Sequence, residues 1–391
     1  MEAYLDNSAT TRCSDRACQL MVDLLTKDYG NPSSLHMKGI EAERFVETAK
    51  KKIAKTLRVS EKEIIFTSGG TESNNLAIIG AAMANRRAGN HIITTSIEHA
   101  SVENPMEFLK EQGFDITYLS VDENGIISLE ELEEAVTEQT ILVSMMQVNN
   151  EIGAIEPVAE AAELIKKKNP DTLIHVDAIQ SYGKMYIYPK KLGIDMLSVS
   201  GHKIHGPKGS GFLWVKEKTK LKPLILGGGQ QKGMRSGTEN VPAIAGFGVA
   251  AKIAFNQMRS TMRHEIALRN YLIQRVLHEI PFCQLNGSHQ NRLPGNANFS
   301  FEYVEGSSLL MMLDAQGICA SSGSACASSS AEPSHVLTAI GLSDELAHAS
   351  LRLTLGRNTT KKELDLVVSI LKETIDQLRS ISDSYLNRIS R

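Results

Sequence analysis

The sequence predicts an α/β fold in which a large domain with a mainly parallel sheet is followed by a smaller α+β domain. Short apolar runs alternate with amphipathic helical stretches from about residue 15 to about residue 255, which is typical of βαβ units. The pattern then changes to a long helical stretch of mixed charge at 251–280, followed by a few strand-like segments. This change predicts the second domain.

Seven apolar runs are expected to form the large sheet, since each has the length and the residue types of one strand. They are Glu63–Thr67, His91–Ser96, Asp115–Ser120, Thr140–Gln147, Thr172–Asp177, Ile194–Ser200 and Gly211–Val215. Amphipathic helices are expected between the strands, for example over Ser128–Val136 and Val158–Lys168.

The smaller domain is expected to contain strands at 296–304, 316–321 and 350–354 and an amphipathic helix over Lys361–Ile381. We predict a large domain at 13–258 and a small domain made of 1–12 and 259–391. The return of the first dozen residues to the small domain is an assignment that the local pattern does not establish.

Composition narrows the classes of protein to consider. The 391 residues are 42% hydrophobic and 22% charged, with a net charge of -3. That mix is typical of a globular chain, and it lacks the basic excess expected for binding nucleic acid or an anionic membrane. No apolar run reaches the roughly 18 residues of a membrane helix, and no signal peptide pattern is visible. We therefore expect a cytoplasmic protein without nucleic-acid or membrane partners.

The five cysteines form neither a C-x-x-C pair nor a cluster with zinc-ligand spacing, so no metal site is expected. Most should be small buried residues, and Cys283 and Cys319 have the apolar neighbours that fit this role. Cys326 differs because it lies in the Gly/Ser/Ala-rich stretch Ser321–His335. We expect a mobile loop there, and hence an exposed and reactive thiol.

Residues that follow the predicted strands are candidates for a ligand site, because ligands of open α/β sheets bind at the carboxyl ends of the strands. The run Ser68–Glu72 (SGGTE) leads into a helix and suits a phosphate, although a simple turn capped at Thr71 is as good a reading. His99 and Asn150 follow two other strands. Taken alone, His99 is better read as an ordinary exposed or satisfied histidine. Asn150 could bind a ligand oxygen or could simply shape its turn.

Three further side chains have a specific chemical reading and a plainer one. Asp177 ends its strand and could hold a ring nitrogen protonated, or could cap a helix. Lys203 lies in a Gly/His/Pro-rich turn and is a Schiff-base candidate, or a solvated lysine. Arg352, in a strand-like segment, could bind a substrate carboxylate or form a structural ion pair.

Together these signals describe one cofactor. An anion cradle, an acid for a pyridine nitrogen and a lysine for an aldehyde are the parts that pyridoxal 5'-phosphate requires. A dinucleotide site is the competing reading, but no G-x-G-x-x-G follows the first strand.

Longer motifs then carry a resemblance. They are YLDNSATTR, GNPSS, FTSGGTESNN, EHASV, VNNEIG, HVDAIQS, SGHKIHGPKG, GGGQQKGMRSGT, SSGSACASSSAEPSHVL and LRLTLGR. In these motifs the sequence resembles the cysteine desulfurases of the NifS/IscS branch of the class V aminotransferase family, which are pyridoxal-phosphate enzymes of fold type I. The resemblance runs nearly end to end and implies an aminotransferase-like large domain. The loop that contains Cys326 resembles that of the family branch in which the cysteine loop is long and mobile.

The resemblance implies a role for each matching residue. Lys203 would bond covalently to the cofactor, Asp177 would keep the ring nitrogen protonated, and His99 would stack on the ring and shuttle protons. The remaining cofactor contacts would be Gln180 and Asn150 at the ring hydroxyl, Gly70, Thr71, Ser200 and His202 at the phosphate, and Thr238 at the phosphate of a neighbouring subunit, so a homodimer is implied. Arg352, and more weakly Asn31, would bind the substrate carboxylate. His205 stands where the family often has an aromatic residue.

The implied reaction converts L-cysteine to L-alanine and leaves the sulfur as a persulfide on Cys326. The sulfur would pass to an acceptor or scaffold protein, for iron–sulfur cluster assembly or another thiolation. Three alternatives stay open on the sequence: a class V aminotransferase, a selenocysteine lyase and a sulfur-relay scaffold without catalysis.

Overall fold

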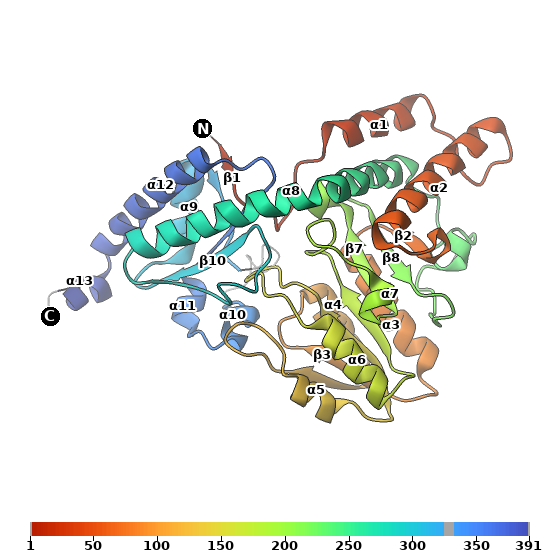
Figure 1. Ribbon diagram of the computed structural model, residues 1–391, viewed down its shortest axis with the longest axis horizontal. Coiled ribbons are helices and arrows are strands. Elements are labelled where there is room, and N and C mark those ends of the chain that lie inside the picture. Colours follow the sequence, from red (N-terminus) through yellow and green to blue (C-terminus); the bar gives the residue numbers. More distant parts are fainter. Residues whose placement is uncertain (1, 324–331, 390–391) are drawn as a thin grey trace.

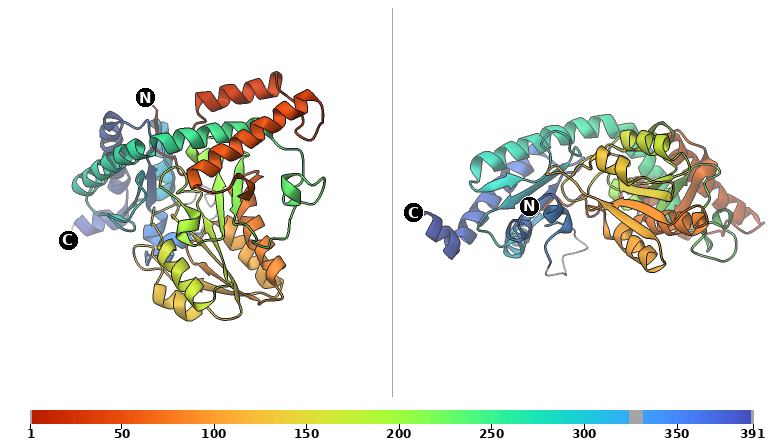
Figure 2. Two further views of the ribbon diagram at one scale, coloured as in Figure 1. Left: turned by 45° about the vertical axis from the view of Figure 1, so that its right-hand side comes forward. Right: turned by 90° about the horizontal axis from the view of Figure 1, so that it is seen from below.

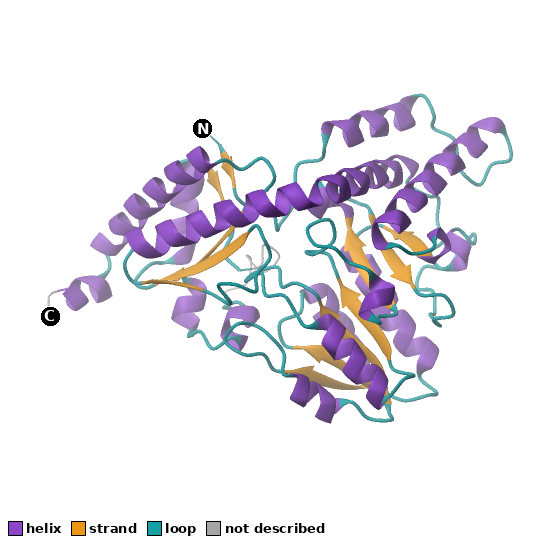
Figure 3. Ribbon diagram, viewed as in Figure 1, coloured by secondary structure: helices purple, strands orange, loops and turns teal. Residues whose placement is uncertain are grey.

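The computed structural model describes residues 2–323 and 332–389 and contains two sheet-based units joined by one long helix (Figure 1). The large sheet and its helices occupy one end of the molecule, and the smaller sheets occupy the other (Figure 3). The predicted fold class is confirmed. Among the described residues, no helix combines the length and the apolar character needed to cross a bilayer.

The large sheet has seven strands in the order β2-β8-β7-β6-β5-β3-β4. All strands are parallel except β8, which runs antiparallel to both of its neighbours. In sheet order the bounds are Ile64–Thr67, Gly211–Val215, Met196–Ser200, Leu173–Asp177, Thr140–Met146, His91–Thr95 and Asp115–Leu119. The seven predicted strands are therefore confirmed.

Helices cover both faces of this sheet, which explains why its strands are continuous apolar runs. Successive residues of one strand face opposite sides, so Phe212 and Trp214 pack in one core cluster and Leu213 in another. The first cluster includes helices α2 (Met37–Leu57) and α6 (Val158–Lys168). The second includes α3 (Gly70–Asn85) and α4 (Ala100–Glu111). Other elements of this unit are α1 (Asp15–Thr26), α5 (Leu129–Ala135), α7 (Pro189–Leu192) and the 3-10 turns η1 (Glu61–Glu63), η2 (Gly201–Ile204) and η3 (Gln231–Gly233).

The smaller unit contains a three-stranded antiparallel sheet in the order β12-β10-β9. These strands span Ser350–Thr354, Asn296–Phe301 and Cys283–Leu285. The third was not among the predicted strands, and the predicted strand at 316–321 is reduced to β11 (Ile318–Cys319). The helices of this unit are α9 (Gly306–Ala315), α10 (His335–Ala339), α11 (Asp344–His348), α12 (Lys361–Ser380) and α13 (Asp383–Ile389).

The N-terminal segment connects the two units. Strand β1 (Ala3–Tyr4) pairs in parallel with β11 of the smaller unit. The chain then passes to the large unit, where the backbone N–H of Thr11 donates to the His202 carbonyl and that of Ser14 to the His205 carbonyl. Residues 8–14 therefore lie beside the turn that carries Lys203.

Helix α8 (Val241–Glu279) runs along both units, as the views in Figures 1 and 2 show. Its first part packs in the core of the large unit and its last part in the core of the smaller one. The helix begins ten residues before the predicted start at 251. The predicted domain boundary at 258 falls inside it and stays a prediction.

Candidate active site

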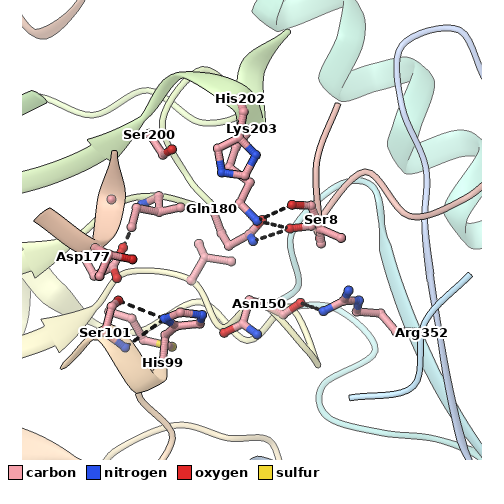
Figure 4. A pocket seen from close by; sticks show the side chains of 16 residues that line it. Ser8, His99, Ser101, Asn150, Asp177, Gln180, Ser200, His202, Lys203 and Arg352 are labelled. Atoms are coloured by element: carbon pink, nitrogen blue, oxygen red, sulfur yellow. Dashed lines mark hydrogen bonds between the residues drawn. The ribbon is translucent and has the colours of Figure 1, made fainter. Parts of the chain in front are cut away.

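A cavity of about 200 Å³ lies at the carboxyl ends of the central strands of the large sheet (Figure 4). Residues at or after the ends of β2, β3, β5, β6 and β7 line it, and the N-terminal segment and β12 of the smaller unit complete it. The lining residues are Ser8, Ala9, Gly70, Thr71, His99, Ser101, Met146, Val148, Asn150, Asp177, Ile179, Gln180, Ser200, His202, Lys203 and Arg352. Ten of the thirteen predicted site residues are thus brought together.

One wall of the cavity is the N-terminus of α3. Its cap residue is Gly69, which has no side chain that could accept hydrogen bonds from the first turn. Backbone N–H groups are therefore available at Gly70 and Thr71. A Cβ on Gly70 would come within 2.2 Å of Ile179 Cδ1, so a larger residue there would have to move the Ile179 side chain, which also lines the cavity. Ser200 and His202 also line the cavity. This combination of a helix N-terminus and polar side chains suits an anionic group.

His202 remains uncharged near neutral pH. Burial, reinforced by nearby lysines, lowers the pKa of its imidazole to about 4. Its Nδ1 lies 3.1 Å from the Thr10 hydroxyl, and its carbonyl accepts a hydrogen bond from the Thr11 hydroxyl. The histidine is therefore a neutral polar wall of the cavity, held by the N-terminal segment.

Asp177 is a fully enclosed carboxyl at the end of β6. Its Oδ1 accepts from the Ile179 backbone N–H at 2.9 Å, and its Oδ2 accepts from Asn74 Nδ2 at 2.7 Å. Burial raises the pKa of this carboxyl, while the two hydrogen bonds and the nearby His99 and Lys203 oppose that shift. A cationic group in the cavity would be a favourable neighbour for the carboxylate.

Lys203 lies on η2, directly after β7. A Cβ on Gly201, the first residue of this turn, would come within 2.5 Å of Ser210 Oγ, so a larger residue there would displace the hydroxyl that donates to the Pro207 carbonyl. The Lys203 ammonium donates to the backbone carbonyls of Ser8 and Ala9, the latter at 2.8 Å. The amine is thus directed into the cavity toward the N-terminal segment (Figure 4).

His205 ends the same turn in a left-handed conformation, with φ of 63°. Its backbone N–H donates to the Thr11 hydroxyl at 2.7 Å, and its Nδ1 lies 3.0 Å from the Arg12 carbonyl. The residue therefore fastens the N-terminal segment to the lysine turn and does not reach the cavity lining.

His99 is the N-cap residue of α4. Its Nδ1 accepts from the Ser101 backbone N–H at 3.0 Å and lies 2.8 Å from the Ser101 hydroxyl. Burial lowers the pKa of the imidazole. The other ring nitrogen points into the cavity (Figure 4). Opposite it, Gln180 donates through Nε2 to the Ser8 carbonyl at 3.0 Å.

Arg352 lines the cavity and also makes an ion pair with Asp6. The predicted binding of a substrate carboxylate stays a prediction. Only 2% of the surface of Arg352 is exposed. One terminal nitrogen donates to Asp6 Oδ1 at 3.0 Å and the other to the Asn150 carbonyl at 3.1 Å. Its Nε makes no hydrogen bond with any described residue. The guanidinium is therefore oriented by protein contacts at the edge of the cavity.

Comparison with known proteins identifies the family of this fold and cavity. Residues 3–367 match the family model described as aminotransferase class-V. The chain belongs to the class-V aminotransferase family.

Several members of this family are similar over nearly the whole chain. A curated relative from Dictyoglomus turgidum, cysteine desulfurase IscS, is 47% identical over 381 residues, which are 97% of this chain and 96% of that protein. A solved structure of a NifS-like protein superposes with a TM-score of 0.91 at 39% identity, covering 96% of this chain and 100% of that one. A structure of SspA in complex with cysteine has a TM-score of 0.80 at 36% identity, covering 92% and 100%.

Two predicted site residues of this class-V aminotransferase family member do not line the cavity. Asn31 is exposed in the connection between α1 and α2, and Thr238 is exposed in the segment before α8. The predicted contact of Thr238 with a neighbouring subunit stays a prediction. Cys326 lies outside the described residues.

Sequence reasoning missed six lining residues, namely Ser8, Ala9, Ser101, Met146, Val148 and Ile179. Ser8 and Ala9 lie in the motif YLDNSATTR, and Ser101 follows His99 in EHASV, so the motifs themselves held a signal. Val148 and Ile179 lie in VNNEIG and HVDAIQS, but as apolar residues they read like any other core residue, and Met146 lies outside the motifs.

The expectation that most cysteines are buried is wrong for the described ones. Cys13, Cys283 and Cys319 are partly exposed, and Cys18 is exposed. Cys283 is in the short edge strand β9 and Cys319 ends the two-residue strand β11, so neither sits in the middle of a covered sheet. An apolar sequence neighbour was therefore a poor guide to burial of these thiols.

Proposed function

We propose that this chain is a cysteine desulfurase that uses pyridoxal 5'-phosphate to move sulfur from L-cysteine to its own Cys326. The observation that carries the proposal is the meeting, in one cavity, of the Lys203 amine, the buried Asp177 carboxyl and the N-terminus of α3. Membership of the class-V aminotransferase family and the cysteine desulfurases among its relatives support the same conclusion.

The donor set of the cavity fits the cofactor. The N-terminus of α3, with Thr71, Ser200 and His202, would hold the phosphate, because backbone N–H groups and neutral side chains suit an anion. Asp177 would face the ring nitrogen and keep its proton, with Gln180 and Asn150 near the ring hydroxyl. Lys203 would hold the aldehyde carbon. When bound, the group supplies an electron sink for negative charge at the substrate's α-carbon.

The residues around the cofactor position would then handle the substrate. Arg352, held by Asp6 and Asn150, would bind the substrate carboxylate through its remaining donor capacity. Lys203, once released from the aldehyde, would take the α-proton, since its turn places the amine in the cavity. Asn31 stays a weaker candidate for carboxylate binding, because it is exposed and lies outside the lining.

The sulfur step requires a nucleophile, and Cys326 is our proposal for it. Its thiolate would attack Sγ of the substrate, so that an S–S bond forms while the Cβ–Sγ bond breaks. The electron pair of the broken bond stays on carbon, which takes up a proton and leaves as L-alanine. The transferred sulfur remains on Cys326 as a persulfide and would pass to an acceptor or scaffold protein, for iron–sulfur cluster assembly or another thiolation.

We further infer a homodimer, in which Thr238 would reach the phosphate held by the neighbouring subunit. Its exposure in the single chain supports this reading, since a residue serving another subunit must lie at the surface. A cytoplasmic location stays a prediction.

The decisive experiment compares Cys326→Ala with the matched control Cys18→Ala, which removes an exposed thiol of α1. We expect both variants to bind pyridoxal phosphate. Only Cys326→Ala should lose the persulfide detected by mass spectrometry, and with it the alanine and sulfide formed from L-cysteine. Wild-type rates in Cys326→Ala would refute Cys326 as the nucleophile. If alanine forms from selenocysteine but not from cysteine, the chain is better described as a selenocysteine lyase.

A further inference from the structure

Asn74 has no role in the proposed mechanism. Its side chain hydrogen-bonds to two polar groups of the cavity lining, Asp177 and Ser101. It lies in the first turns of α3 and is 0% exposed. Its Nδ2 donates to Asp177 Oδ2 at 2.7 Å and to Ser101 Oγ at 2.9 Å. The orientation of the amide is fixed by chemistry, because an amide oxygen would not face a carboxylate oxygen at that distance.

The other end of the same amide shows what this arrangement costs. Asn74 Oδ1 is buried and accepts no hydrogen bond from any of the described residues. A buried acceptor without a partner is unfavourable, so the two donated hydrogen bonds must outweigh that cost. The Asn74 amide is therefore oriented by the two hydrogen bonds that its Nδ2 donates.

Ser101 extends the connection to His99. A lone pair of its hydroxyl oxygen receives the Asn74 hydrogen bond, which leaves the hydroxyl hydrogen for His99 Nδ1, 2.8 Å away. The Ser101 backbone N–H donates to the same nitrogen at 3.0 Å. Because Nδ1 accepts from both groups, a neutral ring must carry its proton on Nε2, the nitrogen that points into the cavity (Figure 4).

We propose that Asn74 is a positioning residue that fixes the Asp177 carboxylate and, through Ser101, holds His99 neutral with its ring proton on Nε2. His99 then presents a hydrogen-bond donor to the cavity, where an atom bearing a lone pair or negative charge would receive it. The use of this donor in catalysis rests on the proposed function, whereas the tautomer is a property of the folded chain.

The charges around His99 come from three elements. Lys203 on η2 and His335 on α10 oppose a positive imidazole, as burial does most strongly, and Asp177 on β6 favours it. The N-terminus of α4 also opposes a cation on its cap residue. Protonation at Nδ1 would in addition break both hydrogen bonds from Ser101. Several contacts therefore keep the His99 ring neutral. One of them, the hydrogen bond from the Ser101 hydroxyl, depends on Asn74.

The test is nuclear magnetic resonance of the full chain, as purified, with ¹⁵N-labelled histidine and without substrate. The variant His99→Gln assigns the His99 signals. We expect the pattern of a neutral ring protonated at Nε2 near neutral pH. A ring protonated at Nδ1, or a doubly protonated ring, would overturn the proposal.

Asn74→Ala then tests the positioning itself, against Asn85→Ala on the same helix. Within the described part of the chain, the amide of Asn85 donates only to the backbone carbonyls of Ala81 and Lys220. In Asn74→Ala, the Ser101 hydroxyl is free to turn, so the Nδ1 signal should move. The pH at which His99 takes up a proton should rise by about 0.5 to 1 unit, the equivalent of one hydrogen bond.

Asn74→Asp serves where the alanine variant does not fold, because it keeps the volume but can donate at most one hydrogen bond. The same direction of shift is expected. His99 signals that match those of Asn85→Ala in both Asn74 variants would refute the role of Asn74. Because these readouts need no turnover, they stand apart from the alanine and persulfide assays, which test the desulfurase reaction itself.

Discussion

Arg352 gives the sharpest prediction, because its contacts separate substrate binding from structural support. In Arg352→Lys the positive charge stays, but a compact ammonium replaces the planar fork that is held by Asp6 and Asn150. Losing one charge-assisted hydrogen bond to the substrate carboxylate costs about 1.5 to 3 kcal/mol. This corresponds to a loss of about 10-fold to 150-fold in kcat/KM for L-cysteine.

The assay measures alanine formed from L-cysteine and alaninamide formed from L-cysteinamide, each at varied substrate concentration. In cysteinamide a neutral amide replaces the carboxylate. If Arg352 binds the carboxylate alike in ground and transition states, KM for cysteine rises while kcat changes little. The wild-type preference for cysteine over cysteinamide should shrink by the same factor. Asp6→Asn is the control, since it removes the ion-pair partner of Arg352 and leaves the guanidinium in place.

Two results would refute this reasoning. If Arg352→Lys lowers kcat/KM equally for cysteine and cysteinamide, Arg352 does not recognise the carboxylate. If Asp6→Asn reproduces the full effect of Arg352→Lys, the ion pair with Asp6 is the main role of Arg352, and its function is structural.

Two further predictions follow from single ionisable side chains, Lys203 and Glu156. Borohydride should fix pyridoxal phosphate to the peptide containing Lys203 in the wild type and in Lys208→Ala, whose lysine is exposed in the connection between η2 and β8. It should not label Lys203→Ala, and labelling of that variant would contradict the assignment. Burial raises the pKa of Glu156 from 4.5 to about 8, so its contribution to stability is fully present below pH 4.5 and is lost as the pH rises toward 8. Glu156→Gln should remove this loss, at most about 1.4 kcal/mol per pH unit, when urea unfolding is measured at several pH values; a pH dependence no different from that of Glu160→Gln, at an exposed position, would contradict it.

Several features of this protein were determined by the sequence alone, because they depend on local pattern. The seven strands of the large sheet were predictable because a strand buried on both faces must be a short, continuous apolar run. Asp177 and Lys203 were predictable as site residues because each follows such a run, and parallel strands bring their carboxyl ends to one edge. The short strands β9 and β11 have too few residues to leave such a pattern.

Only the tertiary structure decided which distant segments meet at that edge. Ser8 and Ala9 receive the Lys203 ammonium across 195 and 194 positions of the chain, and Arg352 reaches Asp6 across 346. Asn74 reads in the sequence as one of two adjacent asparagines on a helix, and its contact with Asp177 spans 103 positions. Hydrogen bonds of this kind depend on how helices and sheets pack. Packing brings together residues that are far apart in the sequence and follow no regular spacing, so no sequence pattern predicts the pairs. The local pattern therefore located the edge of the sheet, and the fold selected the partners that position each group there.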